Sequence, residues 1–252
     1  MIAPRTTEDL FETWRLRRQR EGARVDLLDL YSLVAGDRGV EPEDLPLPER
    51  TELTQRALQV IWPGFEQVAP LRTGDHVEVV TYCSDWPERF REWRGRLSLG
   101  LGPAALRIDH VGSTSVPDLA AKPIIDIQLS VADAADEATY LRGCRDAGFE
   151  LYSRDDAHRF FHVPSPSPRV AHLHVCQAGG QFERDHLLFR DYLRSHADEC
   201  EAYAAVKRSA VLRWGDDRIG YTYAKNGFIL ECLERALEWA TATAWSVEHG
   251  ES

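Results

Sequence analysis

The chain has 252 residues and a formal net charge of −11, with 43% hydrophobic and 28% charged residues. This composition is that of a globular protein with a real core, and the acidic balance excludes broad electrostatic binding to DNA or RNA, which needs a basic face. No window approaches about 18 uninterrupted apolar residues, so we expect no membrane span. The N-terminus lacks an apolar signal region, and five scattered cysteines without a C-x-x-C pair indicate reduced thiols, which predicts a cytoplasmic protein.

Residues 1–72 are predicted to form a helical extension, separate from the rest of the chain. Thr7 can cap a first helix, and apolar residues at helical spacing over Val25–Val34 predict a second. Residues 49–62 form a third, amphipathic helix after a proline-rich loop. We expect the extension to pack on the main domain or on a second copy of the chain, and the second arrangement would give a homodimer.

The main domain is predicted over residues 76–240, and residues 241–252 form a C-terminal tail. Alternating apolar residues indicate its strands, and apolar residues three and four apart indicate its helices. The predicted elements are, in chain order, a strand at 77–80, a helix from Asp85 to about Leu99, a strand around Ile108, a strand from Pro123, a helix at 133–147, strands at 149–153, 159–163 and 170–176 with a turn at 165–168, and helices from about His186 to Glu248 with a break at 215–217.

The most informative stretch of the sequence is a turn between two predicted strands. The turn Gly112-Ser113-Thr114-Ser115 offers backbone N–H groups and hydroxyls, which suit phosphate oxygens. Twelve residues separate Ser113 from Asp126, which is the one acidic residue in the apolar run Ile124–Leu129. The simpler interpretation is a tight turn before a buried strand, with Asp126 paired to a neighbouring arginine.

A Gly-Ser turn, a gap of this size and an aspartate on an apolar strand are the signature of DNA polymerase beta-like nucleotidyltransferases. The chain from about 76 to 240 resembles the GrpB family, a branch of that superfamily. The segments that carry the resemblance are Ile108–Val116, Ala121–Val131, His172–Cys176, Phe189–His196 and Tyr221–Ile229. The resemblance implies an α/β fold, or α+β by stricter labels, with a nucleotidyltransferase-like mixed bent sheet, flanking helices and a C-terminal helical cap beside the N-terminal helical extension. The sequence departs at Asp118, where the family often has Gly.

The resemblance also implies roles for the turn and for the strand that follows it. In this superfamily the turn holds the triphosphate, so Gly112, Ser113, Thr114 and Ser115 are expected to bind the nucleotide, and strand carboxylates such as Asp126 hold Mg²⁺. The superfamily usually places a second carboxylate two residues later, where this chain has Gln128. An amide is a weaker Mg²⁺ ligand than a carboxylate, but Gln128 could bind a water, a base edge or a ribose of the nucleotide.

Two histidines extend the candidate metal site. His172 and His174 point to one face of the strand at 170–176, and His174 lies where the third strand of this fold usually carries its last carboxylate. With Asp126 they could hold a transition metal better than Mg²⁺. The alternative is one core and one surface histidine. For the site as a whole we expect a divalent metal, Mg²⁺ or Mn²⁺, as cofactor. His110 precedes the turn, and we expect it to orient the turn.

Positive charges are needed to offset a triphosphate. Five candidates carry them: Lys122, Arg159, Arg190, Lys207 and Lys225. In the resemblance the C-terminal helices lean over the site and face it with Arg190, Lys207, Tyr221 and Lys225, and Asp126, Lys122 and Lys225 are assigned to catalysis. The alternative for any one of them is a surface salt bridge, in a chain with 41 acidic residues. Three phenylalanines are interpreted as core residues: Phe160, Phe161 and Phe189.

These residues predict an enzyme that moves a nucleotidyl group from a nucleoside triphosphate to a small-molecule acceptor. A second hypothesis, favoured by Gln128, is a binding or regulatory domain that kept the pocket and lost the reaction. A third is an enzyme that activates or ligates a small molecule by another route, using the histidines. The sequence lacks G-x-S-x-G, G-x-x-x-x-G-K-[ST] and G-x-G-x-x-G, so hydrolase, P-loop and dinucleotide-binding motifs give no competing interpretation.

Overall fold

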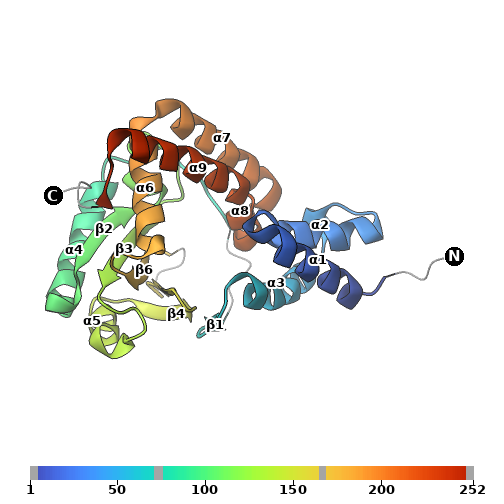
Figure 1. Cartoon of the computed structure of the whole chain (residues 1–252), viewed down its shortest axis with the longest axis horizontal. Coiled ribbons are helices and arrows are strands. Elements are labelled where there is room, and N and C mark those ends of the chain that lie inside the picture. The colour runs from blue at the N-terminus through green and yellow to red at the C-terminus, as the bar shows by residue number, and fades with distance from the viewer. Residues whose placement is uncertain (1–4, 71–75, 165–168, 248–252) are drawn as a thin grey trace.

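The computed structural model describes residues 5–70, 76–164 and 169–247. Its elements are, in chain order, α1 Thr7–Glu21, α2 Leu27–Arg38, α3 Leu47–Ile61, β1 Glu66–Gln67, α4 Trp86–Leu101, β2 Arg107–Val111, β3 Ile125–Val131, α5 Leu141–Asp146, β4 Glu150–Arg154, β5 His158–His162, β6 Ala171–Gln177, α6 Gln181–Ser195, α7 Ala197–Trp214, α8 Arg218–Tyr223 and α9 Asn226–Thr243. The mixed sheet with flanking helices, a C-terminal helical cap and an N-terminal helical extension confirms the predicted fold class (Figure 1).

Six strands form one sheet in the order β1-β4-β5-β6-β3-β2. Strands β3 and β6 at its centre are parallel, and the other neighbours are antiparallel. In the parallel pair Asp126 lies opposite His172, and Gln128 lies opposite His174. Because side chains alternate along a strand, all four residues lie on the same face of the sheet. The register of one strand pair therefore assembles the candidate metal ligands.

The two faces of the sheet are covered differently. Ile125, Ile127 and Leu129 point to the face that packs against α4 and α5, in a core that includes Trp86 and Tyr140. The opposite face carries the polar residues and is covered by α6, with α7 and α9 beside it (Figure 1). An apolar face thus holds the sheet in place, which leaves the polar face available for a site under the C-terminal helices.

The N-terminal helices pack on the main domain, which is one of the two arrangements expected from the sequence. Leu30 and Val34 of α2 belong to a buried cluster that also contains Trp214 of α7 and Ile219 of α8 (Figure 1). The extension is not entirely helical as predicted, because β1 pairs antiparallel with β4 and adds an edge strand to the sheet. The predicted boundary at residue 72 lies outside the described residues.

Two predicted elements are wrong. The helix predicted over 133–147 is only α5, because the Asp133 carboxylate accepts the backbone N–H of Ala135 and holds a turn where the helix would begin. The strand predicted at 77–80 is reduced to one bridge between Val80 and Ala121, while Val77 is buried among the N-terminal helices.

Several element ends also differ from the prediction. Thr6 rather than Thr7 caps α1, in a capping box with Asp9. Strand β3 begins two residues after Pro123, α6 begins before His186, and α9 ends before Glu248. The turn predicted at 165–168 lies outside the described residues. None of these differences moves a residue that belongs to the candidate site.

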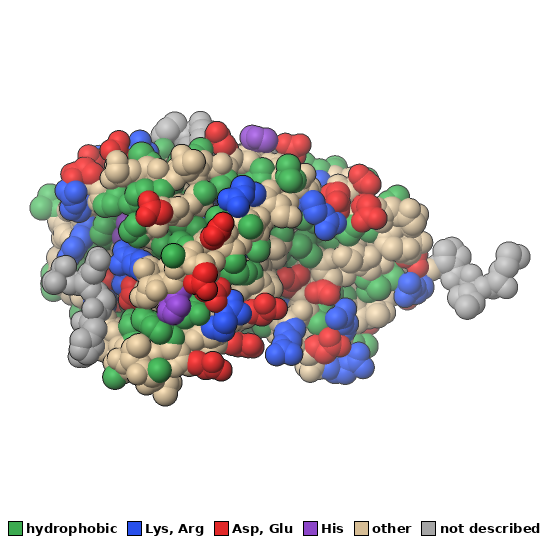
Figure 2. Space-filling model, turned by 90° about the horizontal axis from the view of Figure 1, so that it is seen from above, with side chains coloured by type: hydrophobic (Ala, Val, Ile, Leu, Met, Phe, Trp, Pro, Cys, Tyr) green, Lys and Arg blue, Asp and Glu red, His purple; other side chains and the backbone are tan. Residues whose placement is uncertain are grey.

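Charges of both signs are interspersed over the surface shown in Figure 2, where Lys and Arg alternate with Asp and Glu over the C-terminal and N-terminal helices. Within the described ranges, no helix combines the length and the apolar character required to cross a membrane. Basic groups gather instead in a pocket, which is described below.

Asp118 has φ 63°, in the left-handed region, which explains why a glycine suits this position. An L side chain there costs about 1–2 kcal/mol, less for Asp than for most residues. We expect Asp118→Ala to lower the unfolding free energy by about 1 kcal/mol and Asp118→Gly to leave it equal or higher. Chemical denaturation of the two variants checks this. A greater loss with Gly than with Ala would contradict it.

Candidate functional site

One pocket of about 390 Å³ lies between the polar face of the sheet and the C-terminal helices. The turn after β2, the strands β3 and β6, and the helices α6, α7, α8 and α9 all contribute to its wall. It contains most of the residues that the sequence singled out: Gly112, Ser113, Thr114, Lys122, Asp126, His172, His174, Lys207, Tyr221 and Lys225. The tertiary structure therefore brings together residues from segments that are far apart in the chain.

The Gly-Ser turn reaches the pocket through its first residues. Gly112 has φ 67° and ψ −173°, and a Cβ at this residue would lie 2.4 Å from Oδ2 of Asp126, so only glycine permits this approach. The Ser113 hydroxyl accepts a hydrogen bond from Nζ of Lys207 at 3.1 Å. Thr114 is buried, and its hydroxyl contacts His110 at 3.0 Å and donates to the Ile124 carbonyl. His110 thus holds the turn, in keeping with the prediction.

Asp126, His172 and His174 form the one group of potential metal ligands found among the described residues. One ligand atom from each can be chosen so that all lie within 4.8 Å of one another. Oδ1 of Asp126 is 2.9 Å from Nδ1 of His172 and 4.0 Å from Nε2 of His174. Nε2 of His172 is buried and has no hydrogen-bond partner within the described chain. A carboxylate with two imidazoles is a donor set that suits first-row transition metals better than Mg²⁺.

Electrostatics keep Asp126 ionised. Burial by itself would raise the pKa of this carboxyl, but the hydrogen bond and charge of His172, with the charges of Lys122 and Lys225, hold the pKa below its usual value. Burial lowers the pKa of His172 and, more strongly, that of His174. The cluster therefore combines an anionic oxygen with neutral imidazoles at neutral pH, which is the protonation state that binds metals.

The chain contains only three lysines among its 30 basic residues, and all three line this pocket: Lys122, Lys207 and Lys225. Nζ of Lys225 lies 4.4 Å from the centre of the Tyr221 ring, and Nζ of Lys207 lies 4.5 Å from that of Tyr203. Within the described residues, no ion pair joins a lysine to a carboxylate, while arginines form the ion pairs of the surface. With Arg218, four cations and two carboxylates line the pocket, so it favours an anionic ligand.

Burial lowers the pKa of all three lysines. It brings that of Lys122 to about 7, with help from the neighbouring Lys225 and Arg218 charges. Burial and the Lys225 charge bring that of Lys207 to about 7, and burial brings that of Lys225 to about 8. A lysine whose pKa lies near 7 takes up a proton readily when an anion binds beside it. The positive charge of the pocket can therefore increase when an anionic ligand binds.

The lowered pKa of Lys207 makes stability depend on pH. Between about pH 7 and its ordinary value of 10.5, Lys207 is mostly neutral in the folded protein and charged in the unfolded chain. The unfolded state then binds more protons, so the unfolding free energy rises with pH, by at most about 1.4 kcal/mol per unit. We expect Lys207→Met to remove its share of this slope and leave the shares of Lys122 and Lys225, whereas Arg208→Met, at the next, exposed residue, should keep most of the slope. Urea denaturation from pH 6.5 to 9 checks this, and parallel profiles for wild type and Lys207→Met would contradict it.

Two helix faces complete the pocket with residues that the sequence interpretation missed. Arg218, Tyr221, Thr222 and Lys225 follow the spacing i, i+3, i+4, i+7, and all of them line the pocket. On α6, Phe189 lies three residues after His186 and four after Asp185, so these three residues also share one helix face. This periodicity was readable in the sequence, where the helix face that contains Tyr221 and Lys225 already extends back to Arg218.

Other predicted residues lie outside the pocket. Gln128 is fully buried beneath α6, with Nε2 3.5 Å from the Glu183 carbonyl, so the hypothesis that it binds ligand is wrong. Arg159 pairs with Glu137 at 3.1 Å instead of facing the site. Phe161 belongs to the core as predicted, but two other phenylalanines line the pocket, which corrects their interpretation: Phe160 and Phe189.

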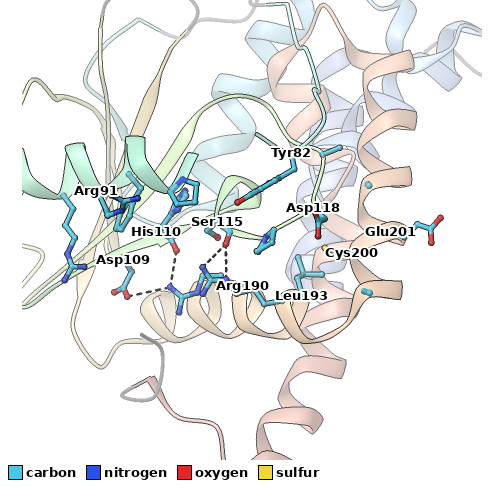
Figure 3. A pocket seen from close by; sticks show the side chains of 18 of the residues that line it. Tyr82, Arg91, Asp109, His110, Ser115, Asp118, Arg190, Leu193, Cys200 and Glu201 are labelled. Atoms are coloured by element: carbon cyan, nitrogen blue, oxygen red, sulfur yellow. Dashed lines mark hydrogen bonds and ion pairs between the residues drawn. The ribbon is translucent and has the colours of Figure 1, made fainter. Parts of the chain in front are cut away.

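Ser115 and Arg190 face a second cavity, of about 910 Å³, between α4, α6 and α7 (Figure 3). The Ser115 hydroxyl donates to the Gly112 carbonyl at 2.6 Å. Arg190 is buried, pairs with Asp191 at 2.7 Å and donates to the carbonyl of His110 at 3.2 Å. Both residues hold the turn and α6 together and lie outside the pocket that contains Asp126, so the structure does not bring them to the other predicted ligands.

Comparisons with known proteins agree with this architecture. A family model described as GrpB protein matches residues 76–235. A UPF0157 protein of Streptomyces coelicolor is 41% identical over 155 residues, which are 62% of this chain and 81% of the relative. A dephospho-CoA kinase of Mycolicibacterium paratuberculosis is 32% identical over 228 residues, which are 77% of this chain and 55% of the kinase. The crystal structure of the conserved protein GrpB from Enterococcus faecalis has a TM-score of 0.57 and 30% identity, and the match covers 64% of this chain and 98% of that one. The chain belongs to the GrpB family.

Proposed function

We propose that this protein is a metal-dependent nucleotidyltransferase of the DNA polymerase beta-like superfamily, which moves a nucleotidyl group from a nucleoside triphosphate to a small-molecule acceptor. The observation that carries the proposal is a single pocket in which Asp126, His172 and His174 meet every lysine of the chain. Phosphoryl-group chemistry depends on positioning and charge neutralisation, and this pocket offers groups for both.

In this proposal the acceptor's oxygen or nitrogen attacks the α-phosphorus, the bond from that phosphorus to the bridging oxygen breaks, and pyrophosphate leaves. Ser113 and Lys207 would hold the leaving phosphates from the turn and α7, and Lys122, Arg218 and Lys225 would neutralise the charge that develops. A divalent metal bound at the Asp126 cluster would polarise the phosphate oxygens. The histidines favour Mn²⁺ over Mg²⁺ in that role.

The second candidate function is a nucleotide- or small-ligand-binding regulatory domain without catalysis. The observation that favours it is the amide of Gln128 two residues after Asp126, which leaves Asp126 as the single carboxylate of the ligand cluster. Two-metal catalysis on this strand needs a second one. Dephospho-CoA kinase activity is not part of either proposal, because the chain covers only about half of that relative and lacks a P-loop motif.

The test uses the full chain with ATP, GTP, CTP or UTP, each with Mn²⁺, with Mg²⁺ and without metal. Thermal stability reports binding, and pyrophosphate release in the presence of pooled small amines, acids and alcohols reports transfer. A Mn²⁺-dependent shift with pyrophosphate release supports nucleotidyl transfer. A shift without release favours the regulatory domain, and no shift with any nucleotide would overturn both nucleotide proposals and favour a different small ligand.

A further inference from the structure

Behind the candidate metal ligand His174 lies a second layer of polar residues from the neighbouring strand. Nε2 of His158, at the start of β5, is 3.0 Å from Nδ1 of His174. On its other side, Nδ1 of His158 faces Oδ2 of Asp155 at 3.7 Å. Phe182 stacks on the His158 ring, with centroids 4.4 Å apart and planes inclined by 18°. The three polar residues therefore form a fixed line that leads from the turn before β5 to the pocket.

The order of donors along this line is set by its outer end. Asp155 can only accept, and its Oδ1 already receives the backbone N–H groups of Ala157 and His158, so its orientation is fixed. Nδ1 of His158 faces the other carboxylate oxygen across 3.7 Å, a charge contact that favours a proton on Nδ1 and leaves a lone pair on Nε2. That lone pair accepts the Nδ1–H of His174, so Nε2 of His174 is also left with a lone pair.

At the end of this line that lies in the pocket, two acceptor atoms face each other, and a cation between them would satisfy both. Nε2 of His174 and Oδ1 of Asp126 lie 4.0 Å apart, and in this tautomer both are acceptors with no proton between them. With bonds of about 2.0–2.2 Å, two neighbouring ligands of one metal ion lie about 3–3.6 Å apart, so a small approach of these two acceptors would let them share one ion. The hydrogen-bond order thus points to a cation at this place independently of sequence motifs.

We propose that Asp155 and His158 are positioning residues, which hold His174 in the tautomer that presents Nε2 to a first-row divalent transition metal shared with Asp126. The inference rests on the metal site of the proposed function and extends it to two residues that do not touch the metal. Outer partners of this kind fix the ring orientation and basicity of a ligand histidine, and their loss typically costs 10–100-fold in metal affinity.

The decisive variant is Asp155→Asn. The amide keeps an oxygen for the two backbone N–H groups but presents its NH₂ to Nδ1 of His158, which reverses every donor along the line and puts a proton on Nε2 of His174. We expect the Kd for Mn²⁺, measured by calorimetry on untagged full-length protein, to rise about 10–100-fold. The matched control is Asp133→Asn, an exposed aspartate that accepts one backbone N–H in a turn without a histidine, and it should stay within about twofold of wild type.

A second measurement tests the tautomer without metal. Long-range ¹H–¹⁵N spectra of protein labelled at histidine should find His174 protonated on Nδ1 in wild type and on Nε2 in Asp155→Asn, with His174→Gln to assign the signals. Protonation on Nε2 in wild type, or equal Mn²⁺ affinity in wild type and Asp155→Asn, would overturn the proposal. Wild type that binds neither Mn²⁺ nor Zn²⁺ would overturn its metal part together with the metal dependence of transfer. Mn²⁺ binding that depends on Asp155, without any nucleotide effect, would support the proposal and overturn nucleotidyl transfer alone.

Discussion

Asp126→Asn is expected to abolish the metal-dependent stabilisation of this protein by a nucleotide. Asp126 supplies the one carboxylate of the ligand cluster, and its Oδ1 is the atom that both histidines approach, at 2.9 and 4.0 Å. A ligand at about 100 times its Kd adds about 2.7 kcal/mol to the unfolding free energy, which raises Tm by roughly 5–10 °C for a domain of this size. We expect that rise in wild type with Mn²⁺ and its absence in the variant, measured by thermal denaturation.

The same substitution should have the opposite effect on anions without metal. Removing the Asp126 charge leaves four cationic side chains and one carboxylate around the pocket, so metal-free pyrophosphate should bind more tightly than to wild type. Asp185→Asn is the matched control, because Asp185 lines the same pocket from α6 but is not part of the ligand cluster. It should keep the metal-dependent shift. A shift that survives in Asp126→Asn would remove Asp126 from the metal site.

Gly112→Ala is expected to destabilise the protein and to close the pocket at its turn. At φ 67° and ψ −173° the backbone lies in a region that only glycine adopts readily, and forcing another residue there costs about 1–3 kcal/mol. The added methyl would also lie 2.4 Å from Oδ2 of Asp126, so the carboxylate would have to move away from His172. We expect a loss of about 2–3 kcal/mol in unfolding free energy and loss of nucleotide binding in the protein that still folds.

Gly22→Ala separates the two effects of that substitution. Gly22 follows α1 with φ 66° and ψ −144°, close to the conformation of Gly112, and a Cβ there would meet no atom within 4 Å. It should carry the backbone cost alone and leave ligand binding unchanged. Chemical denaturation and nucleotide titration of both variants measure the difference. Equal binding by Gly112→Ala and Gly22→Ala would mean that the turn does not shape the site.

The sequence was most informative where local residues decide the structure. The turn at Gly112, the strand with Asp126 and the strand with His172 and His174 are specified within a few residues by alternation and by glycine's freedom. The same locality misled at 133–147, where the Asp133 side chain bonds the backbone and stops the helix from forming. The sequence shows which residues have side chains that can bond to the backbone. Whether such a bond forms and ends a helix depends on the local geometry.

The cations of the site illustrate a different limit. Lys207 and Arg190 are both basic residues on C-terminal helices, and both were expected to face the nucleotide. The structure turns Lys207 to Ser113, while Arg190 is fixed by Asp191 on the other side of the turn. Helical periodicity predicts which residues share a helix face. The packing of that helix on its neighbours determines which part of the protein the face contacts. The three lysines were all among the candidates from the sequence, but only the packing shows that they line one pocket while Arg159 and Arg190 do not.

The sequence by itself determined the fold class, the turn and the strands that contain Asp126, His172 and His174, because each is encoded by short-range pattern and backbone freedom. Only the tertiary structure decided that α6 seals Gln128, that the N-terminal helices pack on α7 and α8, and that Asp155 and His158 stand behind His174. These features depend on strand register and helix packing between segments distant in the chain. Such contacts form because they bury surface together, and no local pattern records which segments will meet.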